Sequence, residues 1–558
     1  MAGLAAGCLA GALLGSPRTV LAAVPPAYNV VNVGSQYGGE PYIISDPAGN
    51  LYDSSPSLGA GFLLSTNHGA GWTGPFTADP SSGDTALGSD QSGAIYLANL
   101  AGGDGGPAPL QSDVFKTIDK GQHFSQGTPV NLPGKTCGTS CSPFGVDRQW
   151  VDGYIPPGGT TDSALVVLMY HDFYGASRID VNISTDGGKK FGNPIDVQAN
   201  FAPAAAQQAG IVNADSLCDT VPVGVFIAKG GPHPGRIITA WIAADPSAPA
   251  TGCNLSQAQS FHNLIVAFSD DQGKTWTPQV AFDGGLFHDA SSPFTGFTLD
   301  NQGNPYFGFT MNLNADPATC ANTNTPPAPK CEFDTYVVYS PDGGSTWKGG
   351  AGTRPPTALL PPPGSAAVPI KVNTDQGTHF FPWIAAQDPG HVVVSYLHTG
   401  DLIATDLNGK EHPGSCFPAA CKFPGVWNLF ASQSANLNAA DPSAVQFATT
   451  QVTEKGMHMG DICNLGIACV PKVSNRNLLD YQTVAIDPLG CAHIAYADDL
   501  NLPNNLKAAN QTAGCFTPAP IGGAAPEAPW AVLLVPTGLA AVWYVSRRRR
   551  GHSLPAAA

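Results

Sequence analysis

The sequence predicts an all-β fold, a β-propeller built from four-stranded blades. Three observations lead to this prediction. An eight-residue turn recurs along the chain at intervals of tens of residues, and each copy follows a short apolar run of strand length. Charged residues make up only 12% of the chain, whereas Gly (65) and Pro (51) are abundant. Regular self-similarity with many short strands and turns is typical of solenoids and propellers.

The recurring turn is clearest at Ser340–Trp347, which reads Ser-Pro-Asp-Gly-Gly-Ser-Thr-Trp. All copies share a hydroxyl residue, Asp or Asn two positions later, Gly four positions later and an aromatic residue seven positions later. The Asp or Asn side chain accepts hydrogen bonds from the backbone of its own turn, and the Gly adopts a positive φ. The five Asp or Asn positions are Asn67, Asp119, Asp186, Asp271 and Asp342.

A second turn, headed by Asp and usually containing Gly, precedes a strand-like run in most units, as at Asp46, Asp90 and Asp300. The two repeats together define seven units, and we therefore expect seven blades, with six as the alternative. The sixth unit has lost the first turn, the seventh shows none, and the run Tyr28–Val33 is a candidate closing strand for the last blade. The units lie near residues 41–72, 89–124, 147–191, 219–276, 294–347, 380–435 and 479–515.

The frame Ser-x-Asp-x-Gly-x-Thr-Trp resembles the Asp-box (BNR) repeat of the sialidase-type β-propeller superfamily. The resemblance covers residues 24–515 and implies the propeller fold; in catalytic sialidases it implies six blades. It says little about activity, because the box is a structural turn shared by enzymes and non-enzymes.

Both ends of the chain predict export and anchoring. Residues 1–23 read as a signal peptide, 516–528 as a Pro/Ala/Gly linker and 529–546 as a transmembrane helix followed by a basic tail, 547–558. The arginines at 547–550 place the tail in the cytoplasm and the propeller outside. We therefore expect a single-pass bacterial cell-surface protein that contacts the cell membrane through this helix. The net charge of −16 argues against a nucleic-acid partner.

The cysteine pattern indicates an oxidising compartment. Apart from Cys8, twelve of the 13 cysteines remain, and their spacing suggests neighbour pairs. Zinc ligation is the alternative, although no pair has histidines at ligand spacing. The expected pairs are Cys137 with Cys141, Cys218 with Cys253, Cys320 with Cys331, Cys416 with Cys421, Cys463 with Cys469, and Cys491 with Cys515.

Topology predicts which face carries the function. If strands run outward from the centre, both repeated turns lie on one face, here called the box face. The opposite face, here called the loop face, carries the longest connections, and loops on a rigid scaffold often carry function. The candidate binding residues on the loop face are Asp147, Trp150, His171, Asp172, Asp219, His379 and His398.

The resemblance to sialidases implies arginines that bind the substrate carboxylate and a tyrosine nucleophile with a carboxylate partner. The residues that would serve are Arg148, Arg178, Arg354, Arg476, Asp480 and Tyr481. However, no Arg-Ile-Pro segment precedes the first box, where catalytic sialidases carry their first arginine. We expect no cofactor and no metal site, because the loop-face histidines come from different units and none follows His-x-x-x-His spacing.

Three functions are compatible with these features. The favoured hypothesis is a surface module that binds a glycan or protein ligand through the loop face; the alternatives are an exo-sialidase-type glycoside hydrolase and an architectural surface protein. Three arginines gathered in one pocket would indicate the hydrolase. Dispersed arginines beside an aromatic or acidic groove would indicate binding, and a channel filled by apolar side chains would indicate architecture.

Overall fold

The computed structural model divides the chain into one unit of residues 1–516 and a second of residues 517–558. The predicted signal segment (1–23), transmembrane span (529–546) and basic tail (547–558) lie outside the described residues and stay predictions. No helix within the described part of the chain is long and apolar enough to cross a membrane. The described residues are 24–34, 38–80, 83–101, 111–127, 146–172, 178–198, 220–243, 263–284, 294–311, 333–350, 368–401, 403–406, 411–413, 421–422, 425–460, 462, 477–501 and 505–517.

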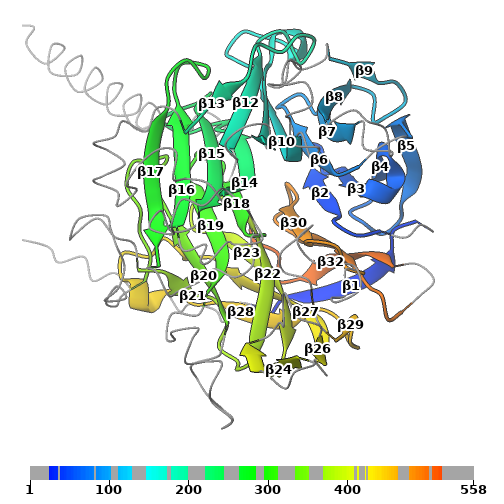
Figure 1. Ribbon diagram of the computed structural model, residues 1–558, viewed down its shortest axis with the longest axis vertical. Coiled ribbons are helices and arrows are strands. Elements are labelled where there is room, and N and C mark those ends of the chain that lie inside the picture. The colour runs from blue at the N-terminus through cyan, green and yellow to red at the C-terminus, as the bar shows by residue number, and fades with distance from the viewer. Residues whose placement is uncertain are drawn as a thin grey trace, which may run out of the picture. The chain divides into compact units, whose positions relative to one another are not determined.

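Seven antiparallel sheets form the blades of a propeller, so the expected ring has seven blades and not six (Figure 1). From inner to outer strand, the first three blades are β2 (Tyr42–Ser45), β3 (Leu51–Ser54), β4 (Ala60–Ser65), β5 (Thr73–Asp79); β6 (Thr85–Ser89), β7 (Ile95–Ala101), β8 (Gln111–Thr117), β9 (Ser125–Gln126); and β10 (Val146–Tyr154), β11 (Leu165–Asp172), β12 (Arg178–Ser184), β13 (Ile195–Asp196). The next two are β14 (Thr220–Ile227), β15 (Ile237–Ala243), β16 (Asn263–Ser269), β17 (Thr277–Asp283); and β18 (Gly296–Leu299), β19 (Pro305–Met311), β20 (Asp334–Tyr339), β21 (Ile370–Lys371).

The sixth blade comprises β22 (Thr378–Ala386), β23 (Val392–Thr399), β27 (Val426–Ser434) and β28 (Ala448–Gln451), with β29 (His458–Met459) also paired to β27. A separate small sheet lies in the chain between β23 and β27 and consists of β24 (Ile403–Asp406), β25 (Glu411–Pro413) and β26 (Cys421–Lys422). Three short 3-10 turns complete the described elements: η1 (Pro56–Leu58), η3 (Thr161–Ser163) and η7 (Pro442–Ala444).

The seventh blade joins the two ends of the propeller. Its strands are β30 (Thr483–Ile486), β31 (Ala492–Ala497), β32 (Leu506–Ala513) and, outermost, β1 (Ala27–Asn32). The predicted closing run thus pairs antiparallel with the last strand, which removes the free edge that an open ring would have.

One of the six expected cysteine pairs falls within the described residues and is confirmed. Cys491 and Cys515 form a disulfide in the seventh blade, with a Cα–Cα distance of 4.4 Å. Cys421 is described only in its backbone, in β26. The pairing of the other cysteines stays a prediction, because they lie outside the described residues: Cys137, Cys141, Cys218, Cys253, Cys320, Cys331, Cys416, Cys463 and Cys469.

The middle strands of the blades are the most buried and the outermost strands are the most exposed. All residues of β11 and β15 are buried, which explains their continuous apolar runs such as Leu165–Tyr170. The outer strand β5 is exposed or half-buried throughout. The core therefore lies between blades and around the ring centre, where successive inner strands adjoin one another.

The five predicted box turns share one hydrogen-bond network. In the copy headed by Ser269, the Ser269 hydroxyl donates to Asp271 at 2.8 Å and accepts from Gly273 N–H at 2.8 Å, and Asp271 accepts from Thr275 N–H at 2.9 Å. The copies headed by Ser65, Thr117, Ser184 and Ser340 repeat these three contacts. Each joins the third strand of its blade to the fourth, so the boxes lie on one face of the ring.

The sixth blade retains part of the box, which corrects the expectation that it was lost. Ser434 donates to Asn436 at 3.1 Å, as the first two box residues do elsewhere. Asn436 then accepts from Gln446 N–H at 3.2 Å, ten positions along the chain, because the turn is longer here. A longer turn needs no Gly at the fourth position, and Asn438 stands there.

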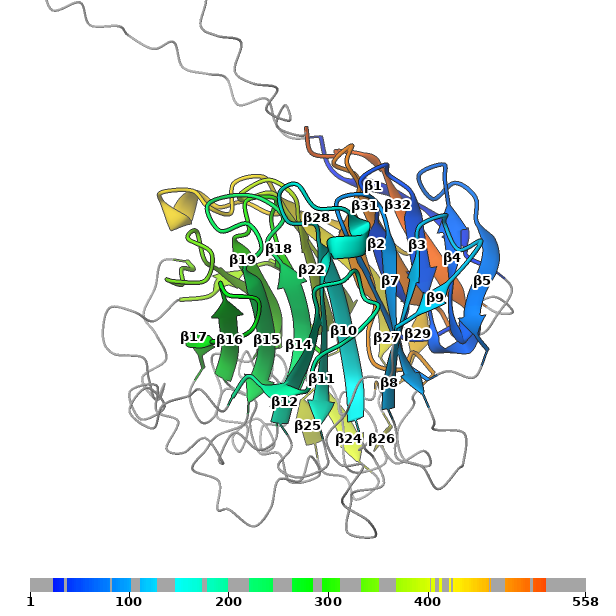
Figure 2. The same cartoon turned by 90° about the horizontal axis from the view of Figure 1, so that it is seen from above.

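The turns of the box face lie at one side of the ring, as the positions of η3 and η7 show (Figure 2). The opposite, loop face is where the inner strands begin. All candidate binding residues within the described part of the chain lie toward this end.

Candidate functional site

A backbone motif missed in the sequence closes the ring centre near the loop face. In four blades, a residue with positive φ stands two positions before an aromatic residue that lies in the inner strand or shortly before it. The four pairs are Glu40 (φ 47°) with Tyr42, Arg148 (φ 53°) with Trp150, Phe381 (φ 53°) with Trp383, and Leu479 (φ 56°) with Tyr481. Positive φ is uncommon for residues other than Gly, and its repetition indicates a shared constraint.

The four aromatic rings pack against one another and form what we call the aromatic plug: Tyr42, Trp150, Trp383 and Tyr481. The ring centroids of Trp383 and Tyr481 are 5.1 Å apart, those of Trp150 and Trp383 5.7 Å, and those of Tyr42 and Trp150 5.4 Å. All four residues are at most 7% exposed. Trp150 and Tyr481, both predicted as site residues, are thus packed core residues in the described structure.

One guanidinium lies beside this plug and is surrounded by carboxylates. Arg148 donates to Glu40 at 3.1 Å and to Asp480, and its Nη1 is 3.9 Å from Asp84. Its guanidinium carbon also lies 5.0 Å from the ring centroid of Tyr481. Cation–π contact and ion pairing together fix the orientation of this buried side chain.

The carboxylates outnumber the guanidinium, and this imbalance affects their protonation. Burial raises the pKa of Glu40 well above its usual range; the Arg148 charge opposes this, and the Asp84 and Asp480 charges add to it. Burial and then Asp84 raise the pKa of Asp147 to about 7, against the charge of Arg148. Burial also raises the pKa of the Tyr481 phenol well above its usual range, which disfavours a nucleophilic phenolate.

The described residues do not show the predicted arginines gathered in one pocket. Arg148 is the one whose side chain is described: Arg354 and Arg476 lie outside the described residues, and Arg178 is described only in its backbone, at the start of β12. His171 and Asp172 are buried at the end of β11, opposite Asp147 and Arg178 respectively in neighbouring strands. Asp219 lies outside the described residues.

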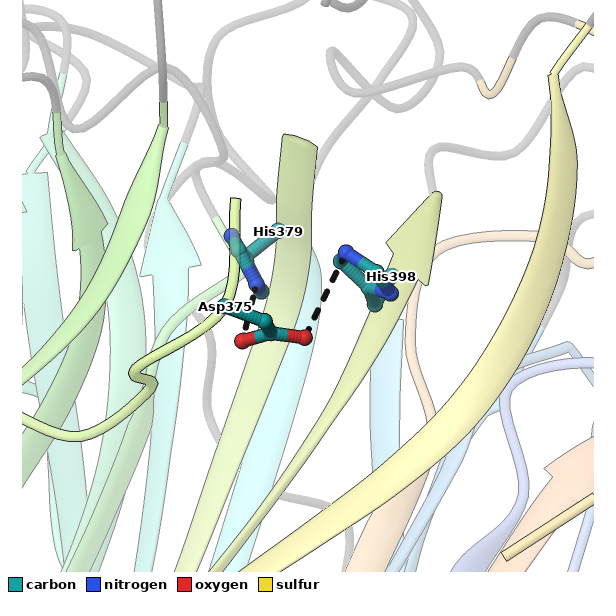
Figure 3. A group of neighbouring side chains, drawn as sticks. All are labelled: Asp375, His379 and His398. Carbon is teal, nitrogen blue, oxygen red and sulfur yellow. Dashed lines mark hydrogen bonds and ion pairs between the residues drawn. The ribbon is translucent and has the colours of Figure 1, made fainter. Parts of the chain in front are cut away.

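His379 and His398 do come together, around an aspartate that the sequence analysis did not select. His379 Nε2 lies 3.3 Å from one oxygen of Asp375, and His398 Nε2 lies 3.5 Å from the other (Figure 3). The two imidazole rings stack with centroids 4.6 Å apart. They meet because His379 near the start of β22 and His398 near the end of β23 are paired in register. Asp375 precedes His379 by four positions, a spacing that a search for histidine pairs does not detect.

The channel is open on the other side of the plug. A cavity of about 190 Å³ lies against Tyr42 and Trp383, and a cavity of about 530 Å³ is lined by the ends of inner strands at the box face. Several polar groups of its wall already have partners: Lys229 binds Asp152 at 2.9 Å and the carbonyl of Ser89 at 2.6 Å. Asp46 likewise accepts from the amides of its own turn.

Glu40, Asp84 and Asp375 are the residues that sequence reasoning missed. Glu40 and Asp84 lie just before the inner strands of the first and second blades. Asp147 was selected because it lies at the start of the inner strand of the third blade. A search for a polar residue before every inner strand would have found both.

Comparison with known proteins gives a likeness in fold alone. No family model matches the chain, and no curated protein matches it in sequence. Among solved structures, the intramolecular trans-sialidase of Ruminococcus gnavus is 12% identical with a TM-score of 0.38, covering 87% of this chain and 97% of its own. An ulvan lyase of polysaccharide lyase family PL25 is 11% identical (TM-score 0.40; 88% and 95% covered), and virginiamycin B lyase from Staphylococcus aureus is 11% identical (TM-score 0.39; 87% and 99%). These activities differ from one another, and the likeness assigns none of them to this chain.

Proposed function

We propose that this chain is an exported, membrane-anchored propeller that binds a surface glycan or protein ligand through its loop face without hydrolysing it. The observation that carries the proposal is that the Arg148 side chain is already paired with carboxylates of the same chain. Its guanidinium is bound by Glu40 and Asp480, so a substrate carboxylate would have to displace a buried internal partner. A closed ion cluster of this kind serves stability and position, so the proposal assigns ligand recognition to the loop face and not to Arg148.

Exo-sialidase activity is the second candidate, favoured by one observation. Glu40, Asp480 and Tyr481 all lie around Arg148, so the residue types that a sialidase needs are gathered at one end of the channel. Against it stand the burial of Tyr481 at 4% exposure and the raised pKa of its phenol. An architectural role is the third, favoured by the aromatic plug.

One experiment separates these candidates. The full chain in detergent is assayed with a fluorogenic sialoside and, in parallel, on a glycan array. We expect no turnover above background and saturable binding to a subset of glycans. Turnover abolished by Tyr481→Phe or Arg148→Ala would establish the hydrolase, and the absence of both turnover and binding would favour a protein ligand or the architectural role.

A pair of charge reversals tests whether the ligand binds at the loop face or at the box face. Asp401 is exposed and follows β23 on the loop face, whereas Asp162 is exposed on η3 at the box face. Asp401→Lys should weaken glycan binding several-fold, because it changes the charge of the proposed contact surface. Asp162→Lys is the matched control and should leave binding unchanged; the reverse result would move the ligand to the box face.

A further inference from the structure

We propose that Asp375, His379 and His398 form a binding site for a divalent first-row transition metal ion, Zn²⁺ in particular. Two imidazoles and one carboxylate are a ligand set that such ions favour. The three potential ligand atoms lie within 4.8 Å of one another. This proposal does not depend on the ligand-binding function proposed above.

The distances fit an ion of this size. Bonds of about 2.0–2.1 Å in tetrahedral geometry place ligand atoms about 3.3 Å apart. His379 Nε2 and His398 Nε2 are already 3.3 Å and 3.5 Å from the two oxygens of Asp375. Side-chain rotations alone would therefore bring one Asp375 oxygen and both nitrogens onto a common ion.

The surroundings of His379 orient it as a ligand. Its Nδ1 lies 2.7 Å from the carbonyl oxygen of Phe333, to which it can only donate, so the neutral ring carries its lone pair on Nε2, facing Asp375. A histidine that donates one N–H to a backbone carbonyl while the other nitrogen binds metal is the usual arrangement in metal sites. The His379 side chain is fully buried, which holds this orientation.

His398 must exchange one hydrogen bond to bind. Its Nε2 lies 3.0 Å from the carbonyl oxygen of Gln376, so in the metal-free protein this nitrogen carries the proton. A neutral imidazole can carry its proton on Nδ1 instead, which frees the Nε2 lone pair for the ion.

The backbone next to the site leaves room for His398. Gly377 has a φ of 136°, and a Cβ at this position would lie 2.6 Å from His398 Nε2 and 2.2 Å from the carbonyl oxygen of Thr399. Asp375 is 34% exposed and His398 14% exposed, so solvent reaches the site. Three protein ligands would leave at least one position on the ion for water or an exogenous ligand.

The test measures metal binding directly. The full chain is freed of metal with a chelator, its accessible thiols are alkylated, and it is titrated with Zn²⁺ and, separately, with Co²⁺. We expect the Co²⁺ form to show a visible absorption band from nitrogen and oxygen ligation. His398→Ala and Asp375→Asn should each lose one equivalent of bound Zn²⁺ or weaken its binding at least about 10-fold.

Two further variants control for folding and for non-specific binding. Gly377→Ala keeps all three ligands but crowds His398, and should also weaken Zn²⁺ binding. His123→Ala removes an exposed histidine that contacts Asp119 at 2.7 Å on the box face, and should leave the Zn²⁺ stoichiometry unchanged. Thermal unfolding without metal establishes that each variant is folded. A wild-type chain that binds no Zn²⁺, or folded His398→Ala and Asp375→Asn chains that bind it like wild type, would overturn the proposal.

Discussion

The Arg148 cluster and the Asp375 group occupy equivalent ends of two inner strands, yet their chemistry is opposite. Both lie where a residue of positive φ stands two positions before a plug tryptophan, in β10 and in β22. Arg148 is one cation among several carboxylates, almost wholly buried, whereas Asp375 is one carboxylate between two imidazoles and partly exposed. The first group satisfies its charges internally; the second retains capacity for an added cation. The same end of two inner strands thus carries a closed ion cluster in one blade and a partly exposed group in another.

The largest expected effect is at the closed cluster. Arg148→Met leaves Glu40 and Asp480 buried without their cation and should lower the free energy of unfolding by about 3–5 kcal/mol. Urea denaturation followed by tryptophan fluorescence measures this loss. Adding Asp480→Asn to Arg148→Met should recover part of it, because one uncompensated charge is removed.

Lys189→Met is the control for that experiment. It breaks an exposed pair with Asp162 at 2.9 Å and should not measurably change stability. If Arg148→Met were as mild as Lys189→Met, the cluster would not be the closed structural element described above.

A smaller effect concerns pH and Asp147. Its pKa of about 7 in the folded state exceeds the unfolded value of about 3.9. The folded state therefore retains a proton that the unfolded state releases between about pH 4 and pH 7, and the stability contribution present below pH 4 is lost as pH rises through this window. Asp147→Asn cannot ionise, although its side-chain oxygen can still accept from Arg148 N–H, a contact of 2.8 Å in the wild type.

We expect Asp147→Asn to gain up to about 3 kcal/mol relative to wild type between pH 4.5 and pH 7.5, because each pKa unit corresponds to about 1.4 kcal/mol. Urea midpoints at the two pH values measure the change. Asp162→Asn serves as the comparison, since a hydrogen bond and the charge of Lys189 lower the pKa of that carboxyl and its contribution has the opposite sign. A parallel pH response in wild type and Asp147→Asn would contradict the raised pKa.

The smallest effect is expected at the open group. His398→Ala without metal should cost about 1 kcal/mol or less, because the ring is partly exposed and its hydrogen bond to Gln376 can be replaced by water. The same denaturation assay applies. A loss as large as that of Arg148→Met would mean that the Asp375 group is a structural element like the Arg148 cluster.

The propeller, its seven blades and the closing strand near the start of the chain could all be predicted from the repeated turns and apolar runs. These features depend on local chemistry: Ser269, Asp271 and Gly273 form their turn from contacts within eight residues, and each apolar run pairs with strands that are close to it in sequence. The Cys491–Cys515 disulfide could also be predicted from the sequence, because both cysteines belong to one blade.

The contacts between the site residues could not be predicted, because they form between distant parts of the chain in the folded ring. Arg148 meets Glu40 108 positions away and Asp480 332 positions away, and no spacing in the sequence encodes that encounter. The plug likewise takes one ring from each of four blades. It includes Trp150, a predicted binding-face residue, and Tyr481, the tyrosine named for the sialidase alternative. His379 and His398 meet through strand register, and the carboxylate between them lies on the preceding loop. The physical reason is common to all three: ring closure sets the distances between inner strands, and it depends on all seven blades at once.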